Sequence, residues 1–271
     1  MRTQTTTILS LLLTTLVGSA LGAGPARADD PKARDVMRKS RYRDDGNNGS
    51  SSVTMILIDD DDKREVRSLK VMKKDFGKDV YQVMFFTDPP DLKNTGFLTL
   101  DYDSASKEDD QWLYLPALRK SKRIASSDKS SSFLGSDFTF ADLSSMNVDD
   151  YDYKLVGESK VDASKVWVIE AKPRSKQVIA RTGVKQSLHM VRQDNYVKVR
   201  EVQWMRTGEM KYWEGKNLQT IDHIVVPTEQ TMTTKKNDKV VHRTIIKVTN
   251  IKFNQQFSDS LFSVSRLEKG L

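Results

Sequence analysis

The sequence has 271 residues and no cysteine, and its 44 lysine and arginine residues exceed its 37 aspartate and glutamate residues, for a net charge of +7. Without cysteine the chain can form no disulfide bond and cannot carry a lipid anchor on a thiol, so burial of apolar side chains must stabilise the fold. The positive charge suits solubility or contact with anionic phospholipid headgroups.

The first 28 residues have the pattern of a secretory signal. Arg2 supplies a positive start, residues 8–17 form a short apolar core, and an Ala-Arg-Ala cleavage site ends at Ala28. Threonines interrupt the core, which is shorter than the roughly 20 residues that a spanning helix needs. We therefore expect the signal to be cleaved, leaving a soluble periplasmic protein for which nucleic acid is not an expected partner.

After the signal, one helix precedes a succession of short strands. Asp29 or Asp30 can cap a helix that has Pro31 at its first position and ends near Arg43. Turn-rich connectors then separate apolar strands, the pattern of an antiparallel sandwich or barrel. A phase change in the last third of the chain predicts a bulge near Arg200. We expect strands at 52–58, 65–73, 80–87, 96–102, 111–115, 154–158, 165–171, 188–192, 197–205, 225–233 and 240–253.

Several central strands are apolar on both faces. In residues 80–86, Tyr81, Val83 and Phe85 share one face, and the opposite face is also apolar. An antiparallel sheet with one solvated face would instead alternate apolar and polar side chains. Either both faces of this sheet are covered, or one face lines a pocket.

The stretch 111–146 organises the rest of the chain. Its first strand ends at Pro116, which lacks a backbone donor, and a basic, serine-rich passage follows. Phe133, Phe138, Phe140, Leu143 and Met146 then occur at spacings that predict a short amphipathic helix. We expect a strand of a curved sheet, a loop, and a helical lid over the apolar inner face.

Motifs for metal binding or catalysis are absent from the sequence. His189, His223 and His242 lie far apart, with no standard zinc-ligand spacing, so no metal or cofactor is expected. Asp128 and Asp137 have serine neighbours, but no base adjoins a nucleophile. We therefore expect no catalytic residue and no enzyme activity.

The block 112–143 resembles the central signature of the outer-membrane lipoprotein-sorting proteins, the LolA-like family, in the branch often found beside RND-type exporters. The Ile-Asp-His-Ile-Val-Val-Pro motif at 221–227 and the closing Phe-Ser-Asp-Ser-Leu-Phe extend the resemblance. It implies one domain, 29–271, with a mainly β fold: a half-open antiparallel β-barrel with an N-terminal helix and a helical lid. The segment after Pro116 is longer and more basic than in lipoprotein carriers of this kind.

The resemblance implies a carrier that binds acyl chains of a lipid or lipoprotein in an apolar cavity and shuttles them toward the outer membrane, with transient membrane contact. The alternative is an accessory or sensor subunit of an exporter or envelope-stress pathway, with an RND-type inner-membrane transporter as partner. The expected cavity and lid residues are Phe85, Leu98, Leu100, Trp112, Tyr114, Phe138, Phe140, Leu143 and Trp167. Arg119 and Arg123 are expected to contact a headgroup or a partner, although a solvated loop explains them equally well.

Overall fold

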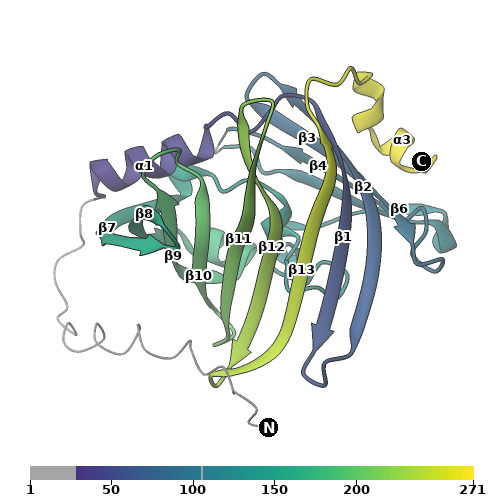
Figure 1. The fold of residues 1–271 in the computed structure, drawn as a ribbon. Coiled ribbons are helices and arrows are strands. Elements are labelled where there is room, and N and C mark those ends of the chain that lie inside the picture. Colours follow the sequence, from purple (N-terminus) through teal and green to yellow (C-terminus); the bar gives the residue numbers. More distant parts are fainter. Residues whose placement is uncertain (1–28, 105) are drawn as a thin grey trace, which may run out of the picture.

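The computed structural model describes residues 29–104 and 106–271, so the predicted signal lies outside the described residues. Its strands form one curved antiparallel sheet in the order β6-β5-β4-β3-β2-β1-β13-β12-β11-β10-β9-β8-β7 (Figure 1). The sheet does not close, because its edge strands β6 and β7 do not pair with each other. This architecture confirms the predicted half-open, mainly β fold.

The strands are β1 (Gly49–Asp59), β2 (Arg64–Phe76), β3 (Asp79–Asp88), β4 (Gly96–Asp101), β5 (Asp110–Leu115), β6 (Lys120–Arg123), β7 (Tyr151–Val161), β8 (Ser164–Pro173), β9 (Val184–Arg192), β10 (Lys198–Met205), β11 (Met210–Ile221), β12 (Ile224–Lys236) and β13 (Lys239–Lys252). The α-helices are α1 (Pro31–Arg41), α2 (Lys176–Thr182) and α3 (Val264–Leu267), and the 3-10 helices are η1 (Pro116–Leu118), η2 (Ser126–Asp128), η3 (Ala141–Leu143), η4 (Val148–Asp150) and η5 (Asp259–Phe262). None of the described helices combines the length and apolarity that a bilayer crossing requires.

All eleven expected strands are present, and the register of β9 and β10 shifts between Lys198 and Arg200, where the bulge was predicted. The sequence analysis missed β6, α2 and most of β11. Gly215 in β11 looked like a loop signal, but a side chain there would approach the ring of Trp213 to 2.8 Å. Glycine is therefore needed in this strand because an aromatic ring packs against its backbone.

The two faces of the sheet are covered by different segments. The insertion, defined as residues 124–150, fills the inner side of the curve, and α1 lies over the β7–β9 end (Figure 1). The C-terminal segment with η5 and α3 covers the outer face of β3, β4 and β5. Both faces of the central strands are therefore apolar because chain segments cover both.

The insertion differs from the predicted amphipathic helix. Its first part is a hairpin. The N–H of Phe133 donates to the carbonyl of Phe138 at 2.7 Å, and the N–H of Phe140 donates to the carbonyl of Ser131 at 3.1 Å. Leu134 and Gly135 adopt left-handed conformations at the tip, and the helical parts of the insertion are the short 3-10 helices η2, η3 and η4. The lid exists, but a hairpin and a 3-10 turn, rather than an α-helix, bring its phenylalanines together.

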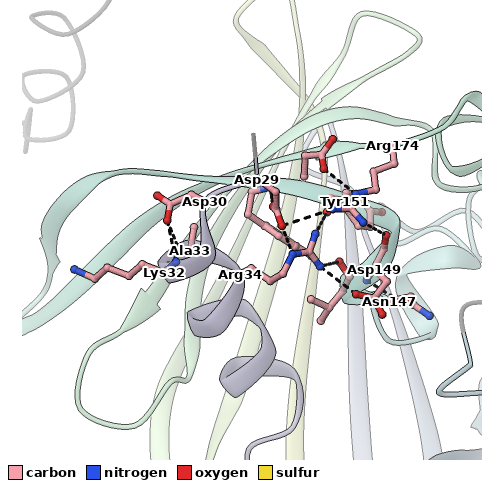
Figure 2. Close-up of polar contacts among 12 residues, drawn as sticks. Asp29, Asp30, Lys32, Ala33, Arg34, Asn147, Asp149, Tyr151 and Arg174 are labelled. Carbon is pink, nitrogen blue, oxygen red and sulfur yellow. Dashed lines mark hydrogen bonds and ion pairs between the residues drawn. The ribbon is translucent and has the colours of Figure 1, made fainter. Parts of the chain in front are cut away.

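Helix α1 is anchored to the sheet at its N-terminal end, as Figure 2 shows. The carboxylate of Asp30 caps the helix by accepting hydrogen bonds from the backbone of Lys32 and Ala33 at 2.9 and 3.2 Å. Arg34 pairs with Asp29 and donates to the carbonyl of Tyr151 at 2.6 Å. These contacts hold the first turn of α1 against β7 and η4.

Replacing Arg34 with alanine is expected to loosen this anchor. The guanidinium also donates to the carbonyl of Val148 at 3.1 Å, so its loss removes a donor from two carbonyls and one ion pair from Asp29. We expect a loss of about 2–4 kcal/mol in the free energy of unfolding, measured by urea denaturation. Lys32→Ala, an exposed residue of the same helix, is the control, and equal midpoints for the two variants would contradict the anchor.

Candidate functional site

An apolar cavity of about 390 Å³ lies on the inner face, between the sheet and the insertion. Side chains of β1, β2, β3 and β13 form its floor, and the insertion forms its roof. Half of the lining residues are polar or charged, among them Arg41, Asp45, Lys73, Gln82 and Asp101, and they form its rim. The other half are apolar: Val53, Met55, Leu69, Val71, Val80, Met84, Phe133, Phe138, Leu143, Ile246 and Val248. Since a cavity of about 150 Å³ can hold a benzene molecule, this one has room for a longer hydrocarbon.

The floor arises from strand register. Met55 lies opposite Ile246, and Val53 lies opposite both Val248 and Leu69, so these side chains project to the same face. The sequence analysis did not single out these residues. Their signal was the largely apolar run from Val53 to Ile58, in which Val53, Met55 and Leu57 share one face. Pairing with Ile246 and Val248 of β13 extends that face into a continuous apolar surface.

The inner face changes character along the sheet. From β1 to β5 its buried side chains are mainly apolar, whereas from β9 to β13 many are polar or charged. Cross-strand pairing of Glu201 with His189 and of Lys211 with Gln203 and Thr234 places these polar groups on the same inner face. An amphiphile, with an apolar tail and a polar head, matches this division.

The insertion is fixed over the cavity by Asp137, whose side chain is almost fully buried. Its carboxylate accepts hydrogen bonds from Thr234 at 2.5 Å, from Thr244 at 2.7 Å and from Nδ1 of His242 at 2.6 Å. Lys211 donates to the Asp137 carbonyl at 2.5 Å. Contacts from β11, β12 and β13 therefore hold the tip of the insertion, and these contacts account for Asp137 without a catalytic role.

Asp101 joins three elements at the rim of the cavity. Its carboxylate accepts from the backbone N–H of Ser145 in the insertion at 2.9 Å and lies 3.8 Å from the guanidinium of Arg41 at the end of α1. Burial and the neighbouring charge of Asp109 raise the pKa of Asp101 to about 6. This carboxylate therefore takes up a proton much more readily than an exposed one.

The raised pKa gives a pH-dependent prediction. Because folding raises the proton affinity of Asp101, its contribution to stability is present below about pH 4 and is lost as the pH rises through about 6. Relative to the parent protein, Asp101→Asn should therefore gain up to about 3 kcal/mol of unfolding free energy between about pH 4 and pH 8. Urea denaturation across this range measures the difference, and a constant difference would contradict the assignment.

The comparison with the variant is needed because a second buried group acts in the opposite direction. Burial lowers the pKa of His189 to about 4, so its contribution to stability is lost as the pH falls through that value. Burial also acts on its neighbour Glu201, but the charges of Lys198 and His189 outweigh burial and lower the pKa of Glu201 to about 2. At neutral pH this part of the inner face holds a neutral histidine beside a Lys198–Glu201 ion pair.

The structure separates the predicted cavity residues into three places. Phe138 and Leu143 line the cavity, and Phe140 packs behind them on Phe97 and Phe133. Trp167 stacks on Tyr196 at the β8 end of the sheet. The remaining five, Phe85, Leu98, Leu100, Trp112 and Tyr114, lie on the outer face with the C-terminal segment. Their side chains therefore do not reach the inner cavity, and a ligand role for them stays a prediction.

The two predicted basic contact residues lie near the β6 edge of the sheet. Arg123 is largely exposed and pairs with Asp110, and Arg119 adopts a left-handed conformation just before the strand. The passage 120–123 is thus an edge strand rather than a loop, and its charged side chains discourage edge-to-edge association. Contact of Arg119 and Arg123 with a headgroup or a partner stays a prediction.

No cluster of three or more potential metal ligands occurs among residues 29–104 and 106–271. Asp128, the other aspartate considered for catalysis, is exposed in η2 and lies apart from the Asp137 contacts. In the described part of the chain, the inner cavity with its polar rim is therefore the site that we consider for function.

Solved structures of other proteins are similar to this fold. A DUF1329 family protein from Desulfovibrio piger matches with a TM-score of 0.81 and 27% identity, covering 89% of this chain and 100% of that chain. A domain described as an outer membrane lipoprotein-sorting protein, from Vibrio parahaemolyticus, matches with a TM-score of 0.79 and 25% identity, covering 88% and 98%. A LolA superfamily protein from Nitrosomonas europaea, at 17% identity and a TM-score of 0.65 over 86% and 98% of the two chains, shares the fold.

No curated protein matches the sequence. The family model that matches, over residues 78–269, carries the description of an uncharacterized protein. That match spans more than half of the chain, and the similar structures extend it across nearly all of the described residues. The chain therefore belongs to the family that this model describes, and its fold is that of the DUF1329 and LolA-like structures.

Proposed function

We propose that this protein is a non-catalytic periplasmic carrier that binds acyl chains of a lipid or lipoprotein in its inner cavity and moves them toward the outer membrane. The apolar cavity of about 390 Å³ beneath the insertion carries this proposal. Each methylene group moved from water into such a cavity contributes about 0.8 kcal/mol, so a short length of chain suffices for useful affinity.

The position of the cavity explains how cargo could enter and leave. Its roof is the insertion, which Asp101 and Asp137 tie to the sheet through hydrogen bonds and which has no α-helix of its own. Release requires a conformation of the protein with lower affinity for the acyl chain. A membrane or partner protein would favour that conformation if it binds the protein more tightly when these hydrogen bonds are broken. The insertion is the element whose movement would open the cavity.

The relatives support a carrier of this kind. The Vibrio parahaemolyticus domain is described as lipoprotein-sorting, and its fold matches over almost the whole of that chain. Periplasmic location follows from the predicted signal, and cargo transfer implies transient membrane contact. A partnership with an RND-type inner-membrane transporter, or an accessory or sensor role beside one, stays a prediction from the sequence resemblance.

Lipid extraction from the protein purified out of the periplasm tests the proposal. We expect mass spectrometry to find acyl lipids at a stoichiometric level, and the delipidated protein to bind a fluorescent fatty acid that dodecanoic acid displaces. Bound lipid and saturable displacement support a carrier. A lipid-free protein that takes up no acyl probe would overturn the proposal.

A further inference from the structure

A second, polar pocket of about 170 Å³ adjoins the apolar cavity. The two share Arg41, Asp101, Asp142, Ser144 and Ser145 on their linings, so one molecule can extend from one into the other. The polar pocket lies toward β9 and β10, where the inner face carries charged side chains. Its volume suits a headgroup of a few non-hydrogen atoms rather than a second acyl chain.

Gln203 shows which chemistry this pocket accepts. Only 6% of this residue is exposed, and its side-chain amide donates from Nε2 to Oε1 of Glu201 at 2.9 Å. Because a carboxylate can only accept, this bond fixes the amide orientation and leaves Oε1 as the remaining acceptor. Among the described residues Oε1 has no hydrogen-bond partner, which is costly for a buried carbonyl. A ligand N–H would satisfy it.

Two carboxylates of the pocket also favour a ligand that donates hydrogen bonds. Asp101 and Asp109 both line the pocket, and burial, followed by the charge of Asp109, opposes the ionisation of Asp101. The guanidinium of Arg41 approaches Asp101 only to 3.8 Å, beyond hydrogen-bond distance. A compact cation beside this pair would neutralise a repulsion that the protein leaves partly uncompensated.

The pocket also offers cations to an anionic group. Lys129 is 2% exposed and donates from Nζ to the Asp109 carbonyl at 2.5 Å, and an ammonium can donate more than one hydrogen bond. Within the described residues, the Arg41 guanidinium donates no hydrogen bond to protein, and it lines both cavities. Carboxylates outnumber cations on the lining as a whole, so a ligand with negative charge alone would be disfavoured.

We propose, resting on the carrier function above, that this pocket binds a phospholipid headgroup that carries both a phosphate and a primary ammonium group. The ammonium lies among Asp101, Asp109 and the Gln203 carbonyl, and the phosphate lies at Arg41 and Lys129. The acyl chains occupy the adjoining apolar cavity. The carrier therefore discriminates among membrane lipids by headgroup as well as by chain.

Calorimetric titration of the full mature protein with short-chain phospholipids tests this assignment. Dihexanoyl phosphatidylethanolamine and dihexanoyl phosphatidylglycerol have the same tails and phosphate, but the first carries an ammonium group where the second carries the hydroxyl groups of glycerol. At about pH 7 we expect the ethanolamine lipid to bind about tenfold more tightly, as a charge-assisted hydrogen bond predicts. Dodecanoic acid serves as a probe for the apolar cavity.

Two variants make the test specific to the pocket. Gln203→Met and Asp109→Asn change residues that line the polar pocket only, so each should reduce the preference for the ethanolamine lipid to about twofold, with dodecanoic acid binding retained. Gln219→Met, at an exposed glutamine of β11, is the matched control and should retain the full preference. Circular dichroism establishes that each variant is folded, and the two independent pocket variants keep the test valid if one of them does not fold.

The outcomes separate this inference from the carrier proposal. Equal affinity for the two phospholipids, with dodecanoic acid still bound, would overturn the headgroup assignment and leave the carrier in place. A preference that the pocket variants do not reduce would place the discrimination elsewhere and would also overturn it. Failure of all three probes to bind would overturn both proposals.

Discussion

Replacing Asp137 with alanine is expected to destabilise the protein by about 3–5 kcal/mol, the largest stability effect that we predict for a residue of the insertion. The substitution removes a buried carboxylate that accepts hydrogen bonds from Thr234, Thr244 and His242. Those three groups come from β12 and β13 and would be left without their acceptor. Urea denaturation at neutral pH measures the loss.

Asp128→Ala is the matched control, because Asp128 belongs to the same insertion but is exposed. We expect it to change the stability by less than about 0.5 kcal/mol. Hydrogen exchange adds a local readout: in Asp137→Ala the amides of Phe133 and Phe140 should exchange faster, because the hairpin that they close has lost its attachment. Similar stabilities for the two variants would contradict the anchoring role.

Filling the cavity is expected to weaken acyl binding roughly a hundredfold in a folded protein. Val71 lines the cavity floor on β2, so Val71→Trp would place an indole ring where the acyl chain is proposed to lie. Excluding three or four methylene groups costs about 3 kcal/mol, or roughly a hundredfold in the dissociation constant of a fatty acyl probe. Displacement of a fluorescent fatty acid measures this change.

Val66→Trp is the control for this experiment, because Val66 lies on the same strand and 48% of it is exposed. It should bind the acyl probe as the parent protein does. If Val71→Trp binds the probe with unchanged affinity while both variants remain folded, the chain does not occupy this cavity. Val53→Phe, on the neighbouring strand, provides a second obstruction of the same floor.

The strands could be predicted from the sequence because their alternation and turn signals are local properties. The bulge near Arg200 was predicted for the same reason, since a change of phase within one strand requires an extra residue. In β11, by contrast, Gly215 resembled a loop residue because its need for close contact with Trp213 depends on packing that the sequence does not display. Local signals are reliable only where tertiary packing does not override them.

The cavity residues could be predicted only in part, because alternation divides a strand into two faces without showing which face is the inner one. Phe85 and Leu98 are as apolar as Met84 and Phe97, but they point to the outer face, where α3 and η5 cover them. Phe138 and Leu143 were named because their spacing predicted an apolar face on the segment expected to cover the sheet, and both line the cavity.

The burial of the polar half of the inner face could not be predicted from the sequence either. Gln203 and Glu201 alternate with Val202 and Trp204, which indicates a strand with one polar face and would ordinarily place that face in solvent. Here the polar face is buried beneath α1 and the insertion. Burial of polar groups is costly, so a protein that retains them beside an apolar cavity has the features expected of an amphiphile carrier.

Photo-crosslinking with a fatty acid that carries a diazirine at its terminal carbon tests the central claim most directly. Residue-level mass spectrometry should locate the crosslinks on inner-face side chains of β1, β2 and β3, such as Val53, Val71 and Met84, and excess dodecanoic acid should suppress them. Crosslinks confined to the outer face around Phe85 and Leu98, or labelling that dodecanoic acid does not suppress, would contradict an acyl-binding cavity on the inner face.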